Sequence, residues 1–241
     1  LSKLLPLNNS FARRINKAFS GARLNPEERL LNYFRWIDRN DLQRLYTSSF
    51  RNELKNNLAE DPMIDFLSDL PKNRSRLERI LTVEQRFFLC DHNLNYTDKM
   101  SMQAGVEVRV PFLNQELVEF VSSLPSHFKQ RGKEGKWILK QAMINYLPRS
   151  IIYRPKTGFG APIRNWLKFE LKEWLSDEIL SKENIQRRGL FEYKAVKELI
   201  EKNQDGLIDA SYTLLSLACI EIWCKIFVDS DIEYGKRGFK N

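Results

Sequence analysis

The sequence contains few cysteines and histidines. Its 241 residues include Cys90, Cys219 and Cys224, with no CxxC pair, and only His92 and His127. An odd number of widely spaced cysteines supports neither a disulfide framework nor a zinc site, so we expect reduced thiols in the core. Two histidines leave little for imidazole-based metal or triad chemistry. We therefore predict no metal site.

The sequence also lacks an uninterrupted run of about 18 apolar residues, the length that a membrane helix needs. Its first residues show neither an initiator methionine nor the apolar region of a signal peptide. We therefore expect a cytoplasmic chain that makes no membrane contact and is part of a longer polypeptide. The composition, 42% hydrophobic and 29% charged, suits a globular chain with a sizeable core. We predict one helical domain over 1–241, with peripheral helices over 1–75, a site-bearing core over 76–230 and a tail over 231–241.

Strand patterns are scarce as well. Alternating β-branched residues appear only in VEVRV at 106–110, whereas apolar residues recur at helical spacing elsewhere. The fold class is therefore predicted to be mainly α, with Asn25 as one N-cap and with a buried helix at 80–94 that carries Asp91 into the interior. A loop is expected over 150–162, where prolines and glycines gather. The predicted helices are 26–37, 38–50, 80–94, 113–124, 136–146, 163–179, 193–202 and 210–228.

The chain carries an excess of positive charge, with a formal net charge of +8. Such an excess can favour nucleic acid, acidic lipid or a phosphorylated small molecule, and charge alone does not choose among them. The excess is concentrated in one stretch, where a single acid, Glu134, accompanies seven cations. These are Arg131, Lys133, Lys136, Lys140, Arg149, Arg154 and Lys156.

The stretch 98–114, DKMSMQAGVEVRVPFLN, places charges inside an otherwise apolar run. Such charges must reach solvent or be paired, because an isolated buried charge costs several kcal/mol. Glu107 and Arg109 are two positions apart and lie on the same side of an extended backbone. They could form an internal structural pair. Alternatively, with Asp98, they could organise a site for a phosphorylated or carboxylate ligand, for which arginine supplies a planar fork of donors.

The second unusual stretch is YRPKTGFGAP at 153–162, which holds Lys156 next to Pro155 and shortly before Gly158 and Gly160. Proline restricts the loop and glycine allows close approach of backbone to a ligand. Such a loop could hold one ammonium group against a phosphate oxygen. An ordinary solvent-exposed loop is the other interpretation.

These stretches also carry a family resemblance. In order along the chain come GVEVRVPFLN, GKWILKQAM, LPRSIIYRPKTGFGAP and SLACIEIW. The combination resembles the C-terminal domain of glutamine-hydrolysing asparagine synthetases, roughly over 27–228. The resemblance implies the helical C-terminal half of an adenine nucleotide α-hydrolase-like domain, without its parallel-sheet nucleotide-binding core.

The resemblance also implies a chemistry and roles for particular residues. In the family, ATP with Mg²⁺ adenylates the aspartate side chain, and ammonia derived from glutamine then attacks the acyl-adenylate. Lys156 and Glu107 look like catalytic residues, with Lys156 on the departing pyrophosphate. Arg109, Asp98 and Asp91 look like substrate- or nucleotide-binding residues.

Three departures from the family pattern limit what this chain can do alone. Asn114 replaces the usual aspartate after Phe-Leu, and both the Ser-Gly-Gly-x-Asp-Ser pyrophosphate loop and the glutaminase's N-terminal cysteine are missing from the sequence. We therefore expect a fragment that is inactive and holds no cofactor by itself. Its expected partners are the missing glutaminase and pyrophosphate-loop regions, aspartate, and glutamine or ammonia.

Other functions remain open. The chain could belong to a related carboxylate-adenylating amidotransferase or a β-lactam synthetase-like enzyme. It could also be a non-catalytic helical module with a basic patch, although we do not expect nucleic acid because interleaved exposed aromatics are missing. A homodimer could form through the apolar helix at 210–228 and through surface left bare by the missing half.

Overall fold

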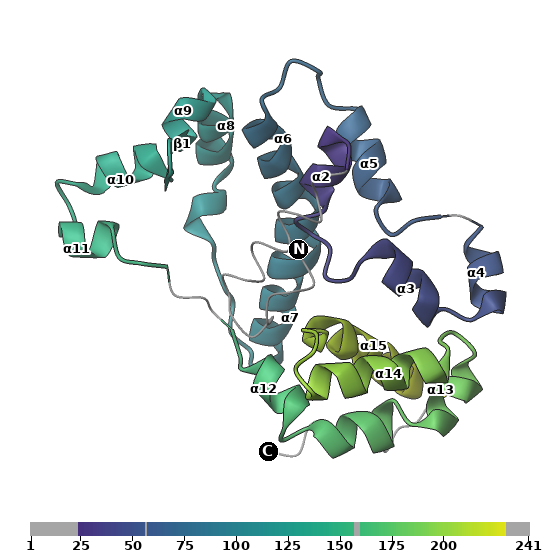
Figure 1. Ribbon diagram of the computed structural model, residues 1–241. Coiled ribbons are helices and arrows are strands. Elements are labelled where there is room, and N and C mark those ends of the chain that lie inside the picture. The colour runs from purple at the N-terminus through teal and green to yellow at the C-terminus, as the bar shows by residue number, and fades with distance from the viewer. Residues whose placement is uncertain (1–23, 56, 157–159, 230–241) are drawn as a thin grey trace. The chain divides into compact units, whose positions relative to one another are not determined.

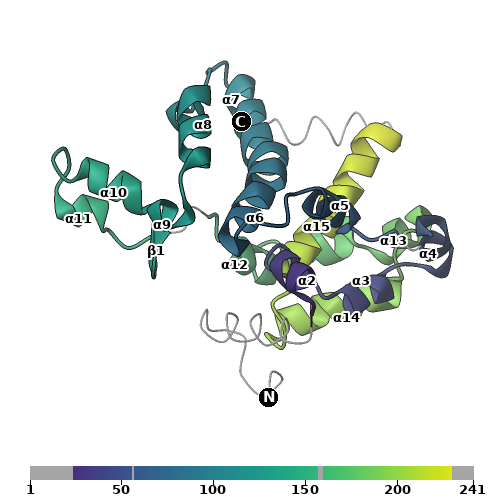
Figure 2. The same cartoon turned by 90° about the horizontal axis from the view of Figure 1, so that it is seen from above.

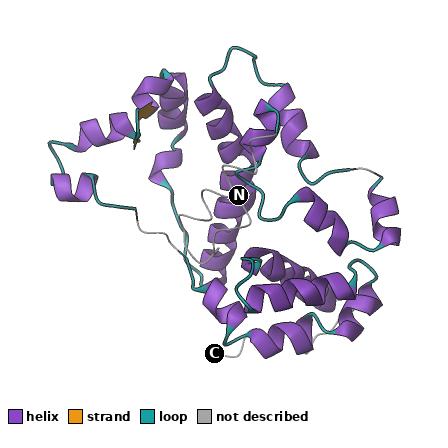
Figure 3. Cartoon of the chain, in the orientation of Figure 1, coloured by secondary structure: helices purple, strands orange, loops and turns teal. Residues whose placement is uncertain are grey.

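The computed structural model describes residues 24–55, 57–156 and 160–229. Helices dominate this part of the chain, and its only sheet is a two-stranded hairpin (Figure 3). The predicted mainly helical fold class is confirmed. The chain divides into two compact units, one made of 1–60 with 159–241 and the other of 61–158. The boundaries proposed from sequence within one helical domain stay a prediction.

The first unit joins an N-terminal set of short helices to the C-terminal helices. Asn25 caps the first of them with a capping box, as predicted. The helix predicted over 38–50 is two helices, because Tyr46 is extended and Thr47 caps a new start. The elements are α2 (Pro26–Leu31), α3 (Arg39–Leu45), α4 (Ser48–Leu54), α12 (Ile163–Lys168), η5 (Trp174–Ile179), α13 (Lys182–Arg188), α14 (Tyr193–Gln204), α15 (Ser211–Trp223) and η6 (Cys224–Val228).

The core of this unit surrounds α15, which packs against α12, α14 and η5 (Figure 1). Leu175, Ile179 and Leu214 are fully buried there. The N-terminal helices join this core through Leu45, and the Thr47 hydroxyl donates a hydrogen bond of 2.7 Å to the carbonyl oxygen of Gly189. Segments far apart in the sequence therefore share one hydrophobic core.

A buried ion pair ties α13 to the C-terminal helix. Glu221, only 5% exposed, accepts hydrogen bonds from Arg188 at 2.8 Å and 3.1 Å. Arg188 also binds Asp229, and this contact lowers the pKa of the Asp229 carboxyl. Buried charges are tolerated when they are paired and hydrogen-bonded. These contacts therefore fix the position of the C-terminal end of α15 and η6 against α13.

The helical stretch Ser211–Val228 is long and apolar enough to cross a membrane by length and composition alone. The buried core helix of a soluble protein passes the same test, so this is weak evidence. Here the stretch carries Glu221 against Arg188 and contributes Leu214 and Leu217 to the core.

The second unit consists of helices in sequence and one hairpin. Ser75 and Glu78 form a capping box, and the three helical segments after Ser75 follow one another without a break (Figure 2). Its elements are α5 (Asp61–Ser68), α6 (Arg76–Val83), η3 (Glu84–Leu94), α7 (Asn95–Gln103), η4 (Pro111–Leu113), α8 (Gln115–Ser123), α9 (Ser126–Lys129), β1 (Gln130–Arg131), β2 (Glu134–Gly135), α10 (Trp137–Met143) and α11 (Arg149–Ile152).

The second unit has very little core of its own. Among its described residues, only Leu67 and Val83 are buried hydrophobic side chains. The helix expected to be buried at 80–94 is present, but Phe88 is 41% exposed and none of η3 is buried. That expectation was wrong for this chain, because apolar side chains need a second packing layer, which this unit does not supply.

Exposed apolar side chains extend over much of the second unit. VEVRV at 106–110, the single strand-like pattern, lies in no strand of the described chain. The exposed members of this apolar surface are Leu81, Phe88, Tyr96, Met100, Met102, Val106, Val108, Val110, Phe112, Leu113, Leu117, Phe120, Ile144, Tyr146, Leu147, Ile151 and Tyr153. Patches of this kind mark interaction surfaces.

Candidate functional site

All five residues singled out from the sequence lie in the second unit. Lys156 follows α11 in the predicted loop, of which residues 157–159 fall outside the described part of the chain. Its side chain is exposed, and no carboxylate within the described ranges pairs with it. An exposed ammonium group without an internal partner is available to an anion, which fits the phosphate role that the resemblance implies.

Glu107 and Arg109 lie on the connection between α7 and η4 and form an ion pair of 2.6 Å. Their side chains are 68% and 83% exposed. The contact agrees with the same-side placement that an extended backbone gives to residues two apart. Because the pair is solvated, it contributes little to stability, and both groups are accessible to a ligand.

The two acidic candidates lie in different helical segments. Asp91 in η3 pairs with Arg86 at 3.1 Å, and both side chains are more than half exposed. Asp98 lies in the first turn of α7, where its backbone carbonyl oxygen accepts a hydrogen bond from the Ser101 hydroxyl. Of the five candidates, Glu107 and Arg109 are the ones that the structure brings into direct contact.

The basic stretch found in the sequence extends over the hairpin, α10 and α11. Lys140 is the member that binds Glu134, at 3.3 Å, and its ammonium group also lies 4.9 Å from the centre of the Tyr153 ring. Arg149 lies over the same ring, and Arg131 lies over Trp137. Cation–π contacts hold these groups without neutralising them. Apart from Lys140, whose charge Glu134 offsets, the positive charge of the stretch therefore stays available to an anionic partner.

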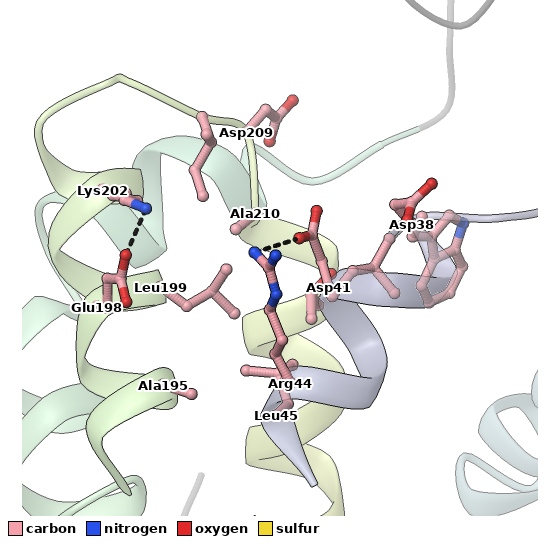
Figure 4. Close-up of a pocket in the computed structure, with 14 residues that line it drawn as sticks. Asp38, Asp41, Arg44, Leu45, Ala195, Glu198, Leu199, Lys202, Asp209 and Ala210 are labelled. Atoms are coloured by element: carbon pink, nitrogen blue, oxygen red, sulfur yellow. Dashed lines mark hydrogen bonds and ion pairs between the residues drawn. The ribbon is translucent and has the colours of Figure 1, made fainter. Parts of the chain in front are cut away.

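The first unit contains a hollow of about 290 Å³ that sequence reasoning missed. Figure 4 shows its apolar base, which includes Leu45 and Leu199, and a rim where Lys202 contacts Glu198. Arg44 on the same rim binds Asp41 at 3.6 Å. None of the five candidate residues lines this hollow. Its residues come from α3 and the residues just before it, from α14, and from the segment that leads into α15, so only the tertiary fold reveals it.

The described residues contain no group of three or more histidine, cysteine, aspartate or glutamate side chains placed to hold a metal ion. The buried ion pair of Arg188 and Glu221 was also not predicted from the sequence. A useful signal was present, because Glu221 interrupts the most apolar helix of the chain and needs a cationic partner.

Comparison with known proteins gives a consistent result. The family described as Asparagine synthase matches residues 3–225. Asparagine synthetase (glutamine-hydrolysing) 1 of Bacillus subtilis is 30% identical over 132 residues, which cover 55% of this chain and 20% of the relative. Asparagine synthetase (glutamine-hydrolysing) 3 of the same organism is 28% identical over 183 residues, which cover 72% of this chain and 29% of that relative.

A relative with a different name also matches. Amidase chyE of Penicillium rubens is 28% identical over 111 residues, which cover 44% of this chain and 16% of the amidase. No solved structure matches the chain. The aligned part spans about a fifth of the length of the first relatives. Because the family match runs through nearly all of both units, the chain belongs to the asparagine synthase family.

Proposed function

We propose that this chain is the C-terminal helical part of the synthetase region of an ATP-dependent, glutamine-hydrolysing asparagine synthetase, and that it acts in the cytoplasm. The family match over residues 3–225 carries the proposal. The exposed apolar surface of the second unit supports it, because a further polypeptide layer would cover that surface. The glutaminase and pyrophosphate-loop regions would belong to that additional polypeptide.

In the proposed reaction, a carboxylate oxygen of aspartate attacks the α-phosphorus of ATP, pyrophosphate leaves, and ammonia then displaces AMP to give the amide. The role of Lys156 is to place positive charge where negative charge grows as the phosphate chain divides. Charge that is fixed before reaction stabilises the transition state without reorganisation. The exposed position of Lys156 and the absence of a carboxylate partner within the described chain support this role.

Glu107 and Arg109 would form part of the wall of the aspartate pocket. Arg109 offers a planar set of donors that suits a carboxylate, and its partner Glu107 keeps the guanidinium oriented. Asp98 and Asp91 are the acidic residues proposed to lie near substrate or nucleotide. Mg²⁺ would neutralise phosphate charge when bound, and we propose that this chain alone holds neither the ion nor ATP.

A second candidate is a related carboxylate-adenylating amidotransferase with a different acid as substrate, such as a β-lactam synthetase-like enzyme. The similarity to Amidase chyE favours this second candidate, because it shows that the chain also resembles a protein that is not named an asparagine synthetase. The two candidates share the adenylation step and differ in the carboxylate.

The test is pyrophosphate release by a full-length protein that carries this chain, with ATP, glutamine and a panel of carboxylic acids. The expected result is release that depends on aspartate, accompanied by asparagine. Release with another acid and none with aspartate would support the second candidate. No release with any acid, in a protein that still hydrolyses glutamine, would refute adenylation altogether.

A further inference from the structure

The loop that carries Lys156 begins at Tyr153, the residue that ends α11. The Tyr153 N–H donates a hydrogen bond of 2.9 Å to the carbonyl oxygen of Arg149. Two residues later, Pro155 has no N–H to donate. From Arg154 to Lys156, no side chain forms a hydrogen bond, ion pair or ring contact with another described residue. Tyr153 is therefore the last side chain before Lys156 that such a contact ties to another element.

The Tyr153 ring is held by cations from two helices. The ammonium group of Lys140, on α10, lies 4.9 Å from the ring centre, and the guanidinium of Arg149, on α11, lies 5.3 Å from it. Figures 1 and 2 both show α11 beside α10. A cation over an aromatic face is attracted by the negative charge of that face. The ring therefore attaches the start of the loop to α10.

The position of Lys140 is itself fixed from the hairpin. Its ammonium nitrogen lies 3.3 Å from a carboxylate oxygen of Glu134 on β2, and the two side chains are only 24% and 31% exposed. Partly buried pairs are screened less by salt than exposed ones. On the neighbouring strand, Arg131 lies 5.1 Å from the ring centre of Trp137 in α10. The hairpin, α10 and α11 are thus joined by a continuous series of contacts that ends at Tyr153.

We propose that Tyr153 is a positioning residue for Lys156. Its ring, held by the cations of α10 and α11, fixes where the loop that carries this lysine begins. The inference rests on the proposed function, because it requires that Lys156 acts on the phosphates. A catalytic group displaced by about 1 Å can lose on the order of a hundredfold in rate. The Tyr153 hydroxyl forms no hydrogen bond within the described chain, so the ring is the part that matters.

Pyrophosphate formation tests the positioning, in a full-length protein that carries this chain, with ATP, glutamine and aspartate. Tyr153→Leu should lower the rate about tenfold, because the start of the loop loses its attachment to α10. Tyr153→Phe should keep most of the rate, because it keeps the ring. The matched control is Phe169→Leu in the first unit, which removes a ring that lies 5.8 Å from the Lys168 ammonium group. It should leave the rate near that of the unchanged protein.

Combination with Lys156→Ala separates positioning from a loss of folding. Lys156→Ala alone should lower the rate about a hundredfold. The double variant Tyr153→Leu/Lys156→Ala should be no slower than Lys156→Ala, because two residues that act as a unit have non-additive effects. A folding defect would act on both backgrounds alike, so the double variant would then be about tenfold slower than Lys156→Ala.

Variants of Lys140 test the attachment without changing the ring. Lys140→Met should lower the rate by less than Tyr153→Leu does, because Arg149 still contacts the ring. Lys140→Arg keeps the cation and should restore the rate.

Three results would overturn the positioning role and leave the proposed function intact. They are a rate for Tyr153→Leu equal to that for Phe169→Leu, equal losses in Tyr153→Phe and Tyr153→Leu, and a further loss when Tyr153→Leu is added to Lys156→Ala. An unchanged rate in Lys156→Ala would instead refute the phosphate role of this lysine, and the positioning role with it.

Discussion

Removing the carboxylate of Glu221 should destabilise the first unit strongly. Glu221 is 5% exposed and accepts two hydrogen bonds from Arg188, whose side chain is 11% exposed, and a third contact comes from Arg187 at 3.4 Å. In Glu221→Ala, the Arg188 guanidinium would stay largely buried without one of its two carboxylate partners. Breaking a buried pair in this way costs about 3–5 kcal/mol.

The lower end of that range applies here, because Asp229 still binds Arg188. We therefore expect the free energy of unfolding to fall by about 3 kcal/mol. Urea denaturation followed by circular dichroism would show this as a midpoint lowered by roughly 1.5 M, for a slope of about 2 kcal/mol/M.

The matched control is Glu201→Ala on α14, which removes a solvent-exposed partner of Lys197 at 3.8 Å. That pair should be worth less than about 1 kcal/mol. In the double variant Glu221→Leu/Arg188→Met, much of the lost stability should return, because no unpaired charge remains buried. Equal midpoints for Glu221→Ala and Glu201→Ala would refute the reasoning.

Three further predictions concern stability. Hydrogen bonds from Arg188 lower the pKa of the Asp229 carboxyl in the folded chain. The stability that this carboxylate contributes is complete above its unfolded pKa and is lost as the pH falls through its folded pKa. Asp229→Asn should therefore lose less stability than the unchanged chain in acid titrations below about pH 4. Ser75→Ala removes the N-cap of α6 and should cost about 1 kcal/mol in thermal unfolding, whereas Ser75→Asp should cost much less. Leu67→Ala truncates one of the two buried hydrophobic side chains described in the second unit and should lower the free energy of unfolding by about 2–5 kcal/mol. Limited proteolysis of the second unit should be faster in this variant than in Leu117→Ala, because the Leu117 side chain is 38% exposed. Equal proteolysis rates in the two variants would contradict this prediction.

Local signals in the sequence predicted much of the secondary structure. The cap at Asn25 and the apolar spacing of 193–202 and 210–228 correspond to α2, α14 and the stretch formed by α15 and η6. These features depend on side chains within a few turns of one another. A short window of sequence is therefore enough to predict them.

Burial was harder to predict than helix formation. The apolar spacing at 80–94 indicated a covered face, yet Phe88 is 41% exposed. Periodicity shows that a face is apolar, but the layer that covers it can belong to other polypeptide. The same limit applies to VEVRV, whose alternation is typical of a strand, although the segment lies in no strand of the described chain.

The candidate site divides in the same way. The contact of Glu107 with Arg109 followed from their spacing and is present at 2.6 Å. The catalytic roles of Lys156, Glu107, Arg109, Asp98 and Asp91 stay predictions, because among these five residues the structure brings only Glu107 and Arg109 into direct contact. The hollow beside α3 and α14 was missed because its lining residues are distant in sequence.

The most direct test of the central claim is pyrophosphate formation after substitution of Lys156 in a full-length protein that carries this chain. Lys156→Ala should lower aspartate-dependent pyrophosphate formation by about a hundredfold or more, because it removes charge stabilisation in the transition state, and glutamine hydrolysis should continue. Lys133→Ala, an exposed lysine of the same basic stretch, should leave both activities near those of the unchanged protein. Pyrophosphate formation by Lys156→Ala that equals formation by Lys133→Ala would contradict the assignment of this lysine to the phosphate site.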